Sequence, residues 1–363
     1  MKTQKTLGCM LAALGMAGSV HAAGTLNIYN WSDYIAEDTV PNFQKANAVK
    51  VRYDVYDSME VLRAKLMTGN SGYDLVVPTN NTLELGIKAG MFQPIDKSKI
   101  PNYKSLDPEL LRIMAQFDPG NKYGVPYFWG VNTLAINVDK VKKALGGSLP
   151  ANQWDLVFKP EVVAKLKGCG VSVLDSPAEF FPMALHYYGK NPNSTNLDDY
   201  KAVMPQLKEA RKSYTRFSSS GYINELAGGS VCVAMGYSGD LNIAKRRAAE
   251  AKNGVKVDVL MPKEGTGIWI DSLAIPKGAA NVDNALKFIN YSLDAKVAAN
   301  NANTVTYAPG ALTAKPLIKK EYVSNPSIFP SKDSLKSSFV MLTVPPKVIQ
   351  GYTRLWQQFK AGK

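Results

Sequence analysis

The sequence predicts an α/β protein of two lobes, each a mainly parallel sheet flanked by helices, with a ligand cleft between the lobes. Three observations support this fold class. The chain has 363 residues, which is long for a single domain. Short apolar runs alternate with longer amphipathic segments, a pattern typical of βαβ units. The alternation stops at an extended run, residues 123–138, and then begins again, which indicates two α/β halves.

Residues 1–23 are typical of a cleaved signal peptide. Lys2 and Lys5 form a basic start, an apolar run follows from Leu7 to Val20, and the small residues after it suit a signal peptidase. The run is shorter than the roughly 20 residues that a membrane-spanning helix needs. We therefore expect a secreted, soluble protein that begins near Ala23 or Gly24.

In the first half of the chain, three strands are each followed by a segment with helical spacing. The second strand alternates apolar and polar residues, and the third is a continuous apolar run of the kind found in buried parallel sheets. The expected strands are residues 25–31, 49–56 and 73–78, and the expected helices are residues 37–46, 58–68 and 82–91.

After the extended run, the same pattern predicts a second α/β half. The expected strands are residues 170–174, 230–237, 255–262 and 267–276, and the expected helices are residues 177–188 and 197–213. We expect residues 24–131 plus about 262–310 in lobe 1, and residues 132–261 plus about 311–363 in lobe 2. A cleft between two such lobes is a common ligand site.

The formal net charge is +13, and removal of Lys2 and Lys5 leaves +11. Basic clusters such as residues 245–247 are short and have acids nearby, so they predict solvated helix faces rather than a nucleic-acid-binding surface. Cys169 and Cys232 remain after maturation, both in apolar segments. An oxidising compartment permits them to pair, and two separate buried thiols are the alternative.

Few residues are suited to catalysis. His186 is the single histidine of the mature chain, which excludes histidine-rich metal sites and an HExxH motif. The sequence has no GxSxG motif, P-loop or strand-linked GxGxxG motif. We therefore expect no enzymatic activity, no catalytic residues, no metal and no cofactor.

Acids beside aromatic residues are the more informative feature. In GIWIDSLAIP, the period of a strand places Trp269 and Asp271 on one face. A carboxylate beside an indole is a favourable site for an ammonium group, through ion pairing and cation–π attraction. The alternative is an exposed sheet edge. In YNWSDYI, the residues Trp31, Asp33 and Tyr34 stand at the end of the first strand, and the alternative is that Ser32 or Asp33 caps the next helix.

Two further acids have a similar setting. Tyr237 and Asp240 lie at the end of a later strand, where Asp240 could instead be a helix N-cap. Glu179 lies in Ser176-Pro177-Ala178-Glu179, which has the pattern of a capping box. Tyr307 lies in a loop and carries no signal of its own.

Six motifs occur in order along the mature chain: YNWSDYI, DVYDS, SGYDLVVP, WDLVFKPE, LDSPAEFFPMALHYYG and VCVAMGYSGD. Together they resemble the periplasmic polyamine-binding proteins, which have the type II periplasmic binding protein fold and deliver putrescine or spermidine to ABC transporters. The resemblance implies a hinge between the lobes, a polyamine in the cleft, a membrane permease as partner and a location in the periplasm. We also expect a monomer.

The resemblance also assigns roles to individual residues. It implies an aromatic box of Trp31, Tyr237, Trp269 and Tyr307, ammonium-binding acids at Asp33, Glu179, Asp240 and Asp271, and hydrogen-bonding side chains at Ser32, Tyr34 and Thr79. It further supports a disulfide between Cys169 and Cys232. The chain departs from the family pattern at Thr79, where serine is usual, and before Asp271, where a Phe-Phe pair is common. The run WGVNTLAIN also lacks the glycines often found at the crossing. These changes alter the pocket walls and leave the choice of amine open.

Three alternatives remain at this stage. The same fold could bind an ω-amino acid, although the sequence identifies no basic partner for a carboxylate. It could serve as the ligand-dependent partner of a sensor. A secreted carboxylate hydrolase is the remote alternative, and it would need two acids about 5–10 Å apart without an aromatic sandwich.

Overall fold

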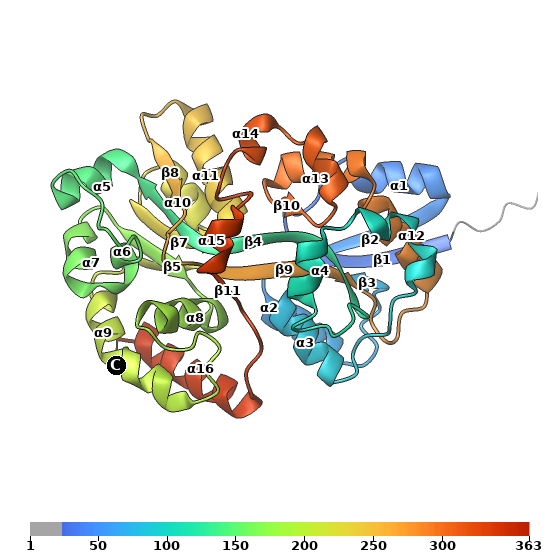
Figure 1. Cartoon of the computed structure of the whole chain (residues 1–363), viewed down its shortest axis with the longest axis horizontal. Coiled ribbons are helices and arrows are strands. Elements are labelled where there is room, and N and C mark those ends of the chain that lie inside the picture. The colour runs from blue at the N-terminus through green and yellow to red at the C-terminus, as the bar shows by residue number, and fades with distance from the viewer. Residues whose placement is uncertain (1–23, 363) are drawn as a thin grey trace, which may run out of the picture.

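The computed structural model describes residues 24–362 and shows two lobes joined by a continuous sheet (Figure 1). The predicted signal peptide lies outside the described residues. The sheet order is β2-β1-β3-β9-β4-β7-β5-β6, with β8, β10 and β11 paired beside this path. Among the described helices, none is long and apolar enough to cross a membrane.

The first lobe contains the amino-terminal end of this sheet. Strands β1 (Gly24–Trp31), β2 (Val49–Tyr56) and β3 (Leu75–Val76) are parallel, and β9 (Gly267–Ala274) runs antiparallel to β3. The flanking helices are α1 (Thr39–Asn47), α2 (Met59–Leu66), α3 (Asn80–Lys88), η1 (Lys97–Lys99), η2 (Pro101–Ser105), α4 (Pro108–Met114), α12 (Val282–Ser292) and α13 (Ala295–Val305).

The second lobe contains the opposite end of the sheet. Strands β5 (Val171–Leu174), β6 (Arg216–Ser218) and β7 (Val233–Tyr237) are parallel. Strand β8 (Val257–Leu260) pairs antiparallel with β4 (Gly124–Asn137). Its helices are α5 (Val138–Leu145), α6 (Asp155–Phe158), α7 (Pro160–Leu166), α8 (Pro177–Tyr187), α9 (Leu197–Arg211), α10 (Tyr222–Ala227), α11 (Ser238–Ala251) and α16 (Pro346–Lys360).

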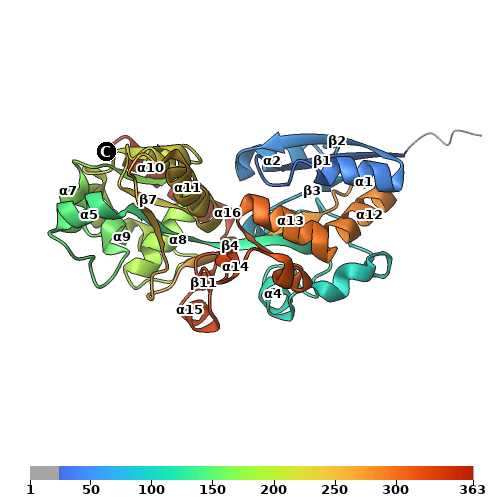
Figure 2. The same ribbon diagram turned by 90° about the horizontal axis from the view of Figure 1, so that it is seen from above.

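Strand β4 (Gly124–Asn137) belongs to both lobes, as Figure 2 shows from above. It pairs with β9 from Gly124 to Asn132 and with β7 from Asn132 to Ile136. All 14 of its residues are buried, which explains why the sequence here is a long apolar run without helical periodicity. The predicted extended connection between two α/β halves is confirmed.

Local sequence sets several of the boundaries. Ser58 begins α2, where its side chain accepts a hydrogen bond from the backbone N–H of Val61. Gly146, with φ of 78°, ends α5 in the left-handed conformation that glycine adopts without a steric penalty. The predicted strand over residues 73–78 is shorter than expected, because only Leu75 and Val76 pair with neighbouring strands.

Each lobe has its own hydrophobic core. One cluster unites β5, β7, α8, α9 and α16, and two others unite the strands and helices of the first lobe. Ala311, Ala314 and Ile318 belong to a first-lobe cluster, so these contacts favour a lobe boundary later in the chain than residue 310. The last elements are β10 (Ala308–Pro309), η3 (Leu312–Leu317), α14 (Lys320–Val323), α15 (Lys332–Lys336) and β11 (Phe339–Val340).

A disulfide joins Cys169 to Cys232, as the resemblance implied. It connects the chain just before β5 to the chain just before β7, two neighbouring parallel strands of the second lobe. The two cysteines are 63 residues apart in the sequence. The bond therefore closes a long loop within one lobe.

We predict that replacing both cysteines by serine lowers the free energy of unfolding by about 4 kcal/mol, because the cross-link restricts the unfolded chain. Urea denaturation of the oxidised protein and of the double variant measures this difference. The same comparison under reducing conditions is the control, and there the two proteins should differ much less. A loss below about 1 kcal/mol would contradict the prediction.

Candidate functional site

The residues that the sequence singled out lie mainly where the two lobes meet. We call this contact region the seam. The first lobe contributes the end of β1, the N-terminal residue before α3, strand β9 and the segment between α13 and β10. The second lobe contributes the first turns of α8 and α11. Several of these segments follow the carboxyl ends of β1, β3, β5 and β7, where α/β sheets present ligand-binding groups.

Asp271 is at the centre of the first-lobe side. It lies in β9, a central strand whose eight residues are all buried, so the alternative of an exposed sheet edge is wrong. Its side chain is 5% exposed and accepts a hydrogen bond of 2.8 Å from Thr79 Oγ1. Burial raises the pKa of Asp271 to about 7, against the lowering effects of Thr79, Tyr34 and Trp31.

Two further donors face this carboxylate. The effects of the Tyr34 hydroxyl and the Trp31 indole on the pKa of Asp271 place both groups close to it. Neither Tyr34 Oη nor Trp31 Nε1 is within hydrogen-bonding geometry of a protein acceptor, although both atoms are buried. Unpaired buried donors are costly, so these groups are available to a ligand or to a small adjustment of the Asp271 side chain.

Aromatic rings from both lobes meet beside Asp271. Trp269 forms edge-to-face contacts with Tyr307, at 5.1 Å between ring centroids, and with Tyr237, at 6.0 Å. Tyr34 forms another such contact with Tyr307, at 5.6 Å. Trp31 lies against Tyr56, at 4.9 Å. Tyr237 comes from the second lobe, so the rings form a wall that crosses the seam.

Two glycines make room for these rings. A Cβ atom at Gly239 would lie 2.4 Å from the Tyr307 ring, and one at Gly130 would lie 2.6 Å from the Trp269 ring. Both distances are far below van der Waals contact. The backbone of α11 therefore approaches Tyr307 more closely than any larger residue at position 239 would allow.

Asp240 holds the second-lobe side of the seam. Its carboxylate accepts hydrogen bonds from Tyr307 Oη at 2.7 Å and from Tyr222 Oη at 2.8 Å. Burial raises the pKa of Asp240, the two phenols lower it, and the neighbouring Asp33 raises it further. Asp240 is the third residue of α11, and Tyr237 occupies the N-cap position, so the N-cap interpretation of Asp240 is wrong.

Glu179 is 6% exposed and lies in the first turn of α8. Asn132 Nδ2 donates a hydrogen bond of 2.5 Å to its carboxylate. Burial raises the pKa of Glu179 to about 7, Asn132 opposes this, and the charge of Asp271 adds to it. The capping box is not formed in the predicted way, because the Ser176 side chain makes no cap hydrogen bond.

Ser32 and Asp33 lie at the exposed edge of the site. Asp33 has a φ of 55°, in the left-handed region, and its neighbour Ser32 bonds to the backbone oxygen of Tyr56. Neither residue caps α1, whose N-cap position is Asp38. The charge of Asp33 raises the pKa of Asp240, which belongs to the other lobe.

Two side chains that the sequence did not single out complete the arrangement. Tyr222, in α10, bonds to Asp240 and accepts a hydrogen bond from the backbone N–H of Tyr237. Asn132, in β4, holds Glu179. A signal existed for Asn132 only, since it is a polar residue in the middle of a long apolar run.

The four acids share one electrostatic property. Within residues 24–362, no ion pair involves Asp33, Glu179, Asp240 or Asp271. In the same part of the chain, no group of three or more histidine, cysteine or carboxylate side chains is arranged to hold a metal ion. The site therefore concentrates acids that form no ion pair beside aromatic rings, and only Arg247 acts on one of them, Asp240, from a distance. A small cavity of about 30 Å³ is lined in part by Arg63, Asn81 and Tyr352, and none of the four acids lines it.

A protein family, two relatives and a solved structure are similar to this chain over nearly all or most of its length. The family model of bacterial extracellular solute-binding proteins matches residues 38–330. The chain is 48% identical to the putrescine-binding periplasmic protein PotF of Escherichia coli, over 99% of each chain. It is 46% identical to the putrescine-binding periplasmic protein SpuD of Pseudomonas aeruginosa, over 99% of this chain and all of that one. A solved structure from Listeria monocytogenes, described as a putative spermidine/putrescine ABC transporter, is 30% identical, with a TM-score of 0.82 over 94% of this chain and all of that one.

We predict that the Glu179 and Asp271 carboxyls make the closed form of the ligand-free protein less stable as the pH rises from about 4 to about 7. The carboxyls of Glu179 and Asp271 titrate near pH 4 in an unfolded chain and near pH 7 in the folded protein. Between these values the folded protein holds more protons than the unfolded chain, so the free energy of unfolding falls. Urea denaturation across this pH range measures the slope.

The substitutions Asp271→Asn and Glu179→Gln should each flatten this slope and stabilise the closed form of the ligand-free protein above pH 7.5, by about 3–4 kcal/mol. The control is Asp283→Asn, which removes an exposed carboxylate whose pKa is lowered by Lys99. That variant should keep the slope of the parent. Equal slopes in all four proteins would show that the two buried carboxyls do not titrate as described.

Proposed function

Because the chain belongs to the bacterial extracellular solute-binding protein family, we propose that it captures a linear polyamine between its lobes and delivers it to the permease of an ABC importer. The relatives named for putrescine support this substrate class. We propose the periplasm as its location and a monomer as its working form. We propose no enzymatic activity.

The observation that carries the proposal is the grouping of the four acids into two pairs. The charge of Asp271 raises the pKa of Glu179, and the charge of Asp33 raises the pKa of Asp240, so each acid of the second lobe lies within electrostatic range of one acid of the first lobe. Each pair combines one residue from each lobe. Four acids that form no ion pair within the described residues, with only Arg247 acting on Asp240 from a distance, match a molecule with an ammonium group at each end.

The rings beside these acids suit the rest of such a molecule. Putrescine and spermidine have methylene chains between their charges, and burial of each methylene contributes about 0.8 kcal/mol. Tyr237, Trp269 and Tyr307 offer ring faces and edges for this contact, with Trp31 at the first-lobe side. An ammonium group beside an aromatic ring also gains cation–π attraction.

Lobe closure then couples the two kinds of contact. A bound amine touches both members of each acid pair only when the lobes are together, so binding favours the closed form. Closure also excludes water, which strengthens every ion pair inside the site. The permease can recognise the closed form as the loaded one.

The proposed ligand-binding set contains the aromatic box, the four acids and three hydrogen-bonding residues: Trp31, Ser32, Asp33, Tyr34, Thr79, Glu179, Tyr237, Asp240, Trp269, Asp271 and Tyr307. Thr79 acts through its hydrogen bond to Asp271. Tyr307 acts both as a ring and as a donor to Asp240. Burial raises the pKa of Tyr307 well above its ordinary value, so the phenol stays protonated and donates.

We predict that refolded, ligand-free protein binds putrescine or spermidine, and that Asp271→Asn weakens this binding about 100-fold or more. Removing one partner of a buried charge pair costs about 2–5 kcal/mol. Calorimetric titration with putrescine, cadaverine, spermidine, spermine, 4-aminobutyrate and 5-aminovalerate measures the affinities. A ligand at a hundred times its dissociation constant should also add about 2.7 kcal/mol of stability.

The matched control is Asp283→Asn, which removes an exposed carboxylate of the first lobe from an ion pair with Lys99. It should bind the amine as tightly as the parent does. Binding of the amino acids alone would keep the fold and overturn the polyamine. Binding of none of the six compounds would overturn the proposed substrate class.

A further inference from the structure

Helix α11 has two packed faces of opposite character. Leu241, Ala244 and Ala248 share one face and belong to the core of the second lobe. Gly239, Asn242 and Arg246 share the opposite face, since they are three and four residues apart. The apolar face packs in the core of the second lobe. The other face forms hydrogen bonds with residues outside that core.

The polar face contacts the carboxyl-terminal part of the first lobe at three successive places. Thr306 Oγ1 donates to the backbone oxygen of Gly239 at 2.9 Å. Asn242 contacts the segment that follows α14. Arg246 Nη1 donates to Tyr322 Oη at 3.3 Å.

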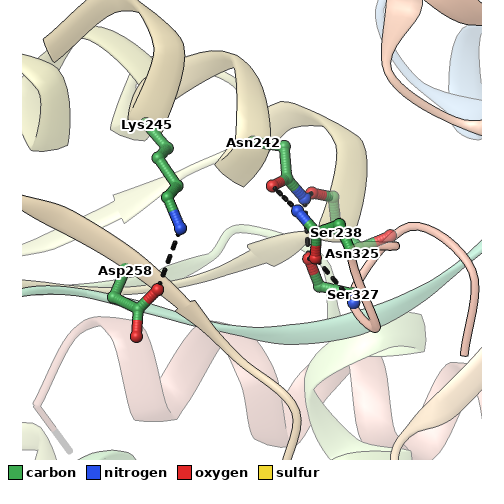
Figure 3. A network of polar contacts seen from close by, with 6 residues as sticks. All are labelled: Ser238, Asn242, Lys245, Asp258, Asn325 and Ser327. Atoms are coloured by element: carbon green, nitrogen blue, oxygen red, sulfur yellow. Dashed lines mark hydrogen bonds and ion pairs between the residues drawn. The ribbon is translucent and has the colours of Figure 1, made fainter. Parts of the chain in front are cut away.

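Asn242 has the most extensive of these contacts (Figure 3). Its Nδ2 donates to Ser327 Oγ at 2.8 Å and to the backbone oxygen of Ser238 at 2.7 Å, and its Oδ1 accepts from Asn325 Nδ2 at 2.8 Å. Ser327 donates in turn to Asn325 Oδ1 through both its hydroxyl, at 2.7 Å, and its backbone N–H, at 3.0 Å. Asn242 is 6% exposed and Ser327 is 1% exposed.

The segment that holds Asn325 and Ser327 is attached to the first lobe. Tyr322, Val323 and Phe329 pack against a core cluster of that lobe. The backbone N–H of Lys319 donates to Asn303 Oδ1, in α13, at 2.9 Å. The hydrogen bonds of Asn242 therefore run from one lobe to the other, two residues after the ligand-site residue Asp240.

We propose that Asn242, Asn325 and Ser327 form a clasp that closes when the two lobes close around the ligand and that opens into water when they separate. This inference rests on the proposed function. Amide and hydroxyl groups exchange protein partners for water at a small net cost, so a buried polar contact can separate repeatedly. An apolar contact of the same size would favour the closed form without ligand.

The clasp gives Asn242 a positioning role. It holds the first turns of α11, and with them Asp240, against the lobe that supplies Tyr307. The amine does not touch Asn242, so the clasp favours closure around any ligand that fits. Its loss should weaken the affinities for different amines by the same factor.

The test uses Asn242→Ala and Asn325→Ala in the full mature chain, with Lys245→Ala as the matched control. Lys245 lies on the same helix and bonds to Asp258 at 3.0 Å, within the second lobe (Figure 3). We expect each asparagine variant to bind putrescine about tenfold more weakly by calorimetry, which corresponds to about 1.4 kcal/mol. The double variant should lose little more than either single one, because both remove the same contact.

Two measurements separate a clasp from a fixed structural contact. Urea denaturation of the ligand-free variants should give the same free energy of unfolding as the parent, and an equal loss in the free and bound forms would overturn the proposal. With Asn242→Cys and Asn325→Cys together, putrescine should speed oxidative cross-linking. Immediate and complete cross-linking without ligand would also overturn it.

The proposed function fails separately from the clasp. If the parent protein binds none of the amines, the substrate class is wrong, whereas the cross-linking rate still shows whether residues 242 and 325 meet only part of the time. If the parent binds putrescine and all variants bind it equally well, the proposed function stands and the clasp is wrong.

Discussion

Buried negative charge at the seam between the lobes is the constraint on which the rest of the structure depends. Glu179 and Asp271 are almost inaccessible to water, and within the described chain neither has a basic partner. A carboxylate in this position destabilises the protein unless it takes up a proton or a cation. The seam can therefore not be an ordinary core. Each lobe must fold on apolar contacts of its own, as the separate clusters of buried residues show.

The shared sheet reconciles this independence with a common site. Strand β4 pairs with β9 in one lobe and with β7 in the other, and Asn132 is the residue at which both pairings meet. The same Asn132 donates to Glu179. The strand that connects the lobes thus also positions Glu179 between them. A change in the angle between the lobes would therefore move the Glu179 carboxylate relative to the first lobe.

The sequence predicted the longer strands, the helices α1, α2, α3, α8 and α9, and the extended connection, because these depend on local periodicity; it did not predict α4–α7, α10, α12–α16 or the short strands β6, β10 and β11. It also placed the acids beside aromatic residues, since strand ends and their neighbours can be recognised in the chain. It did not predict Tyr222 or the role of Asn132, and its helix-cap alternatives for Asp33 and Asp240 and its capping box at Glu179 were wrong. Those features arise from contacts between residues far apart in the sequence, where a capping pattern gives no indication of which partner the side chain meets.

The positive net charge of the chain is compatible with a site for cations, because salt screens the exposed basic side chains and the acids lie within the site. The ion pairs of the described chain lie mainly on exposed side chains, such as Lys99 with Asp283 and Lys245 with Asp258. Salt screens exposed charges over about 8 Å at physiological ionic strength, whereas charges in a buried seam are screened much less. Distant lysines therefore repel an approaching amine only weakly. Once the amine has entered the seam, the nearby carboxylates dominate, and the strength of binding is set by how completely the lobes exclude water around them.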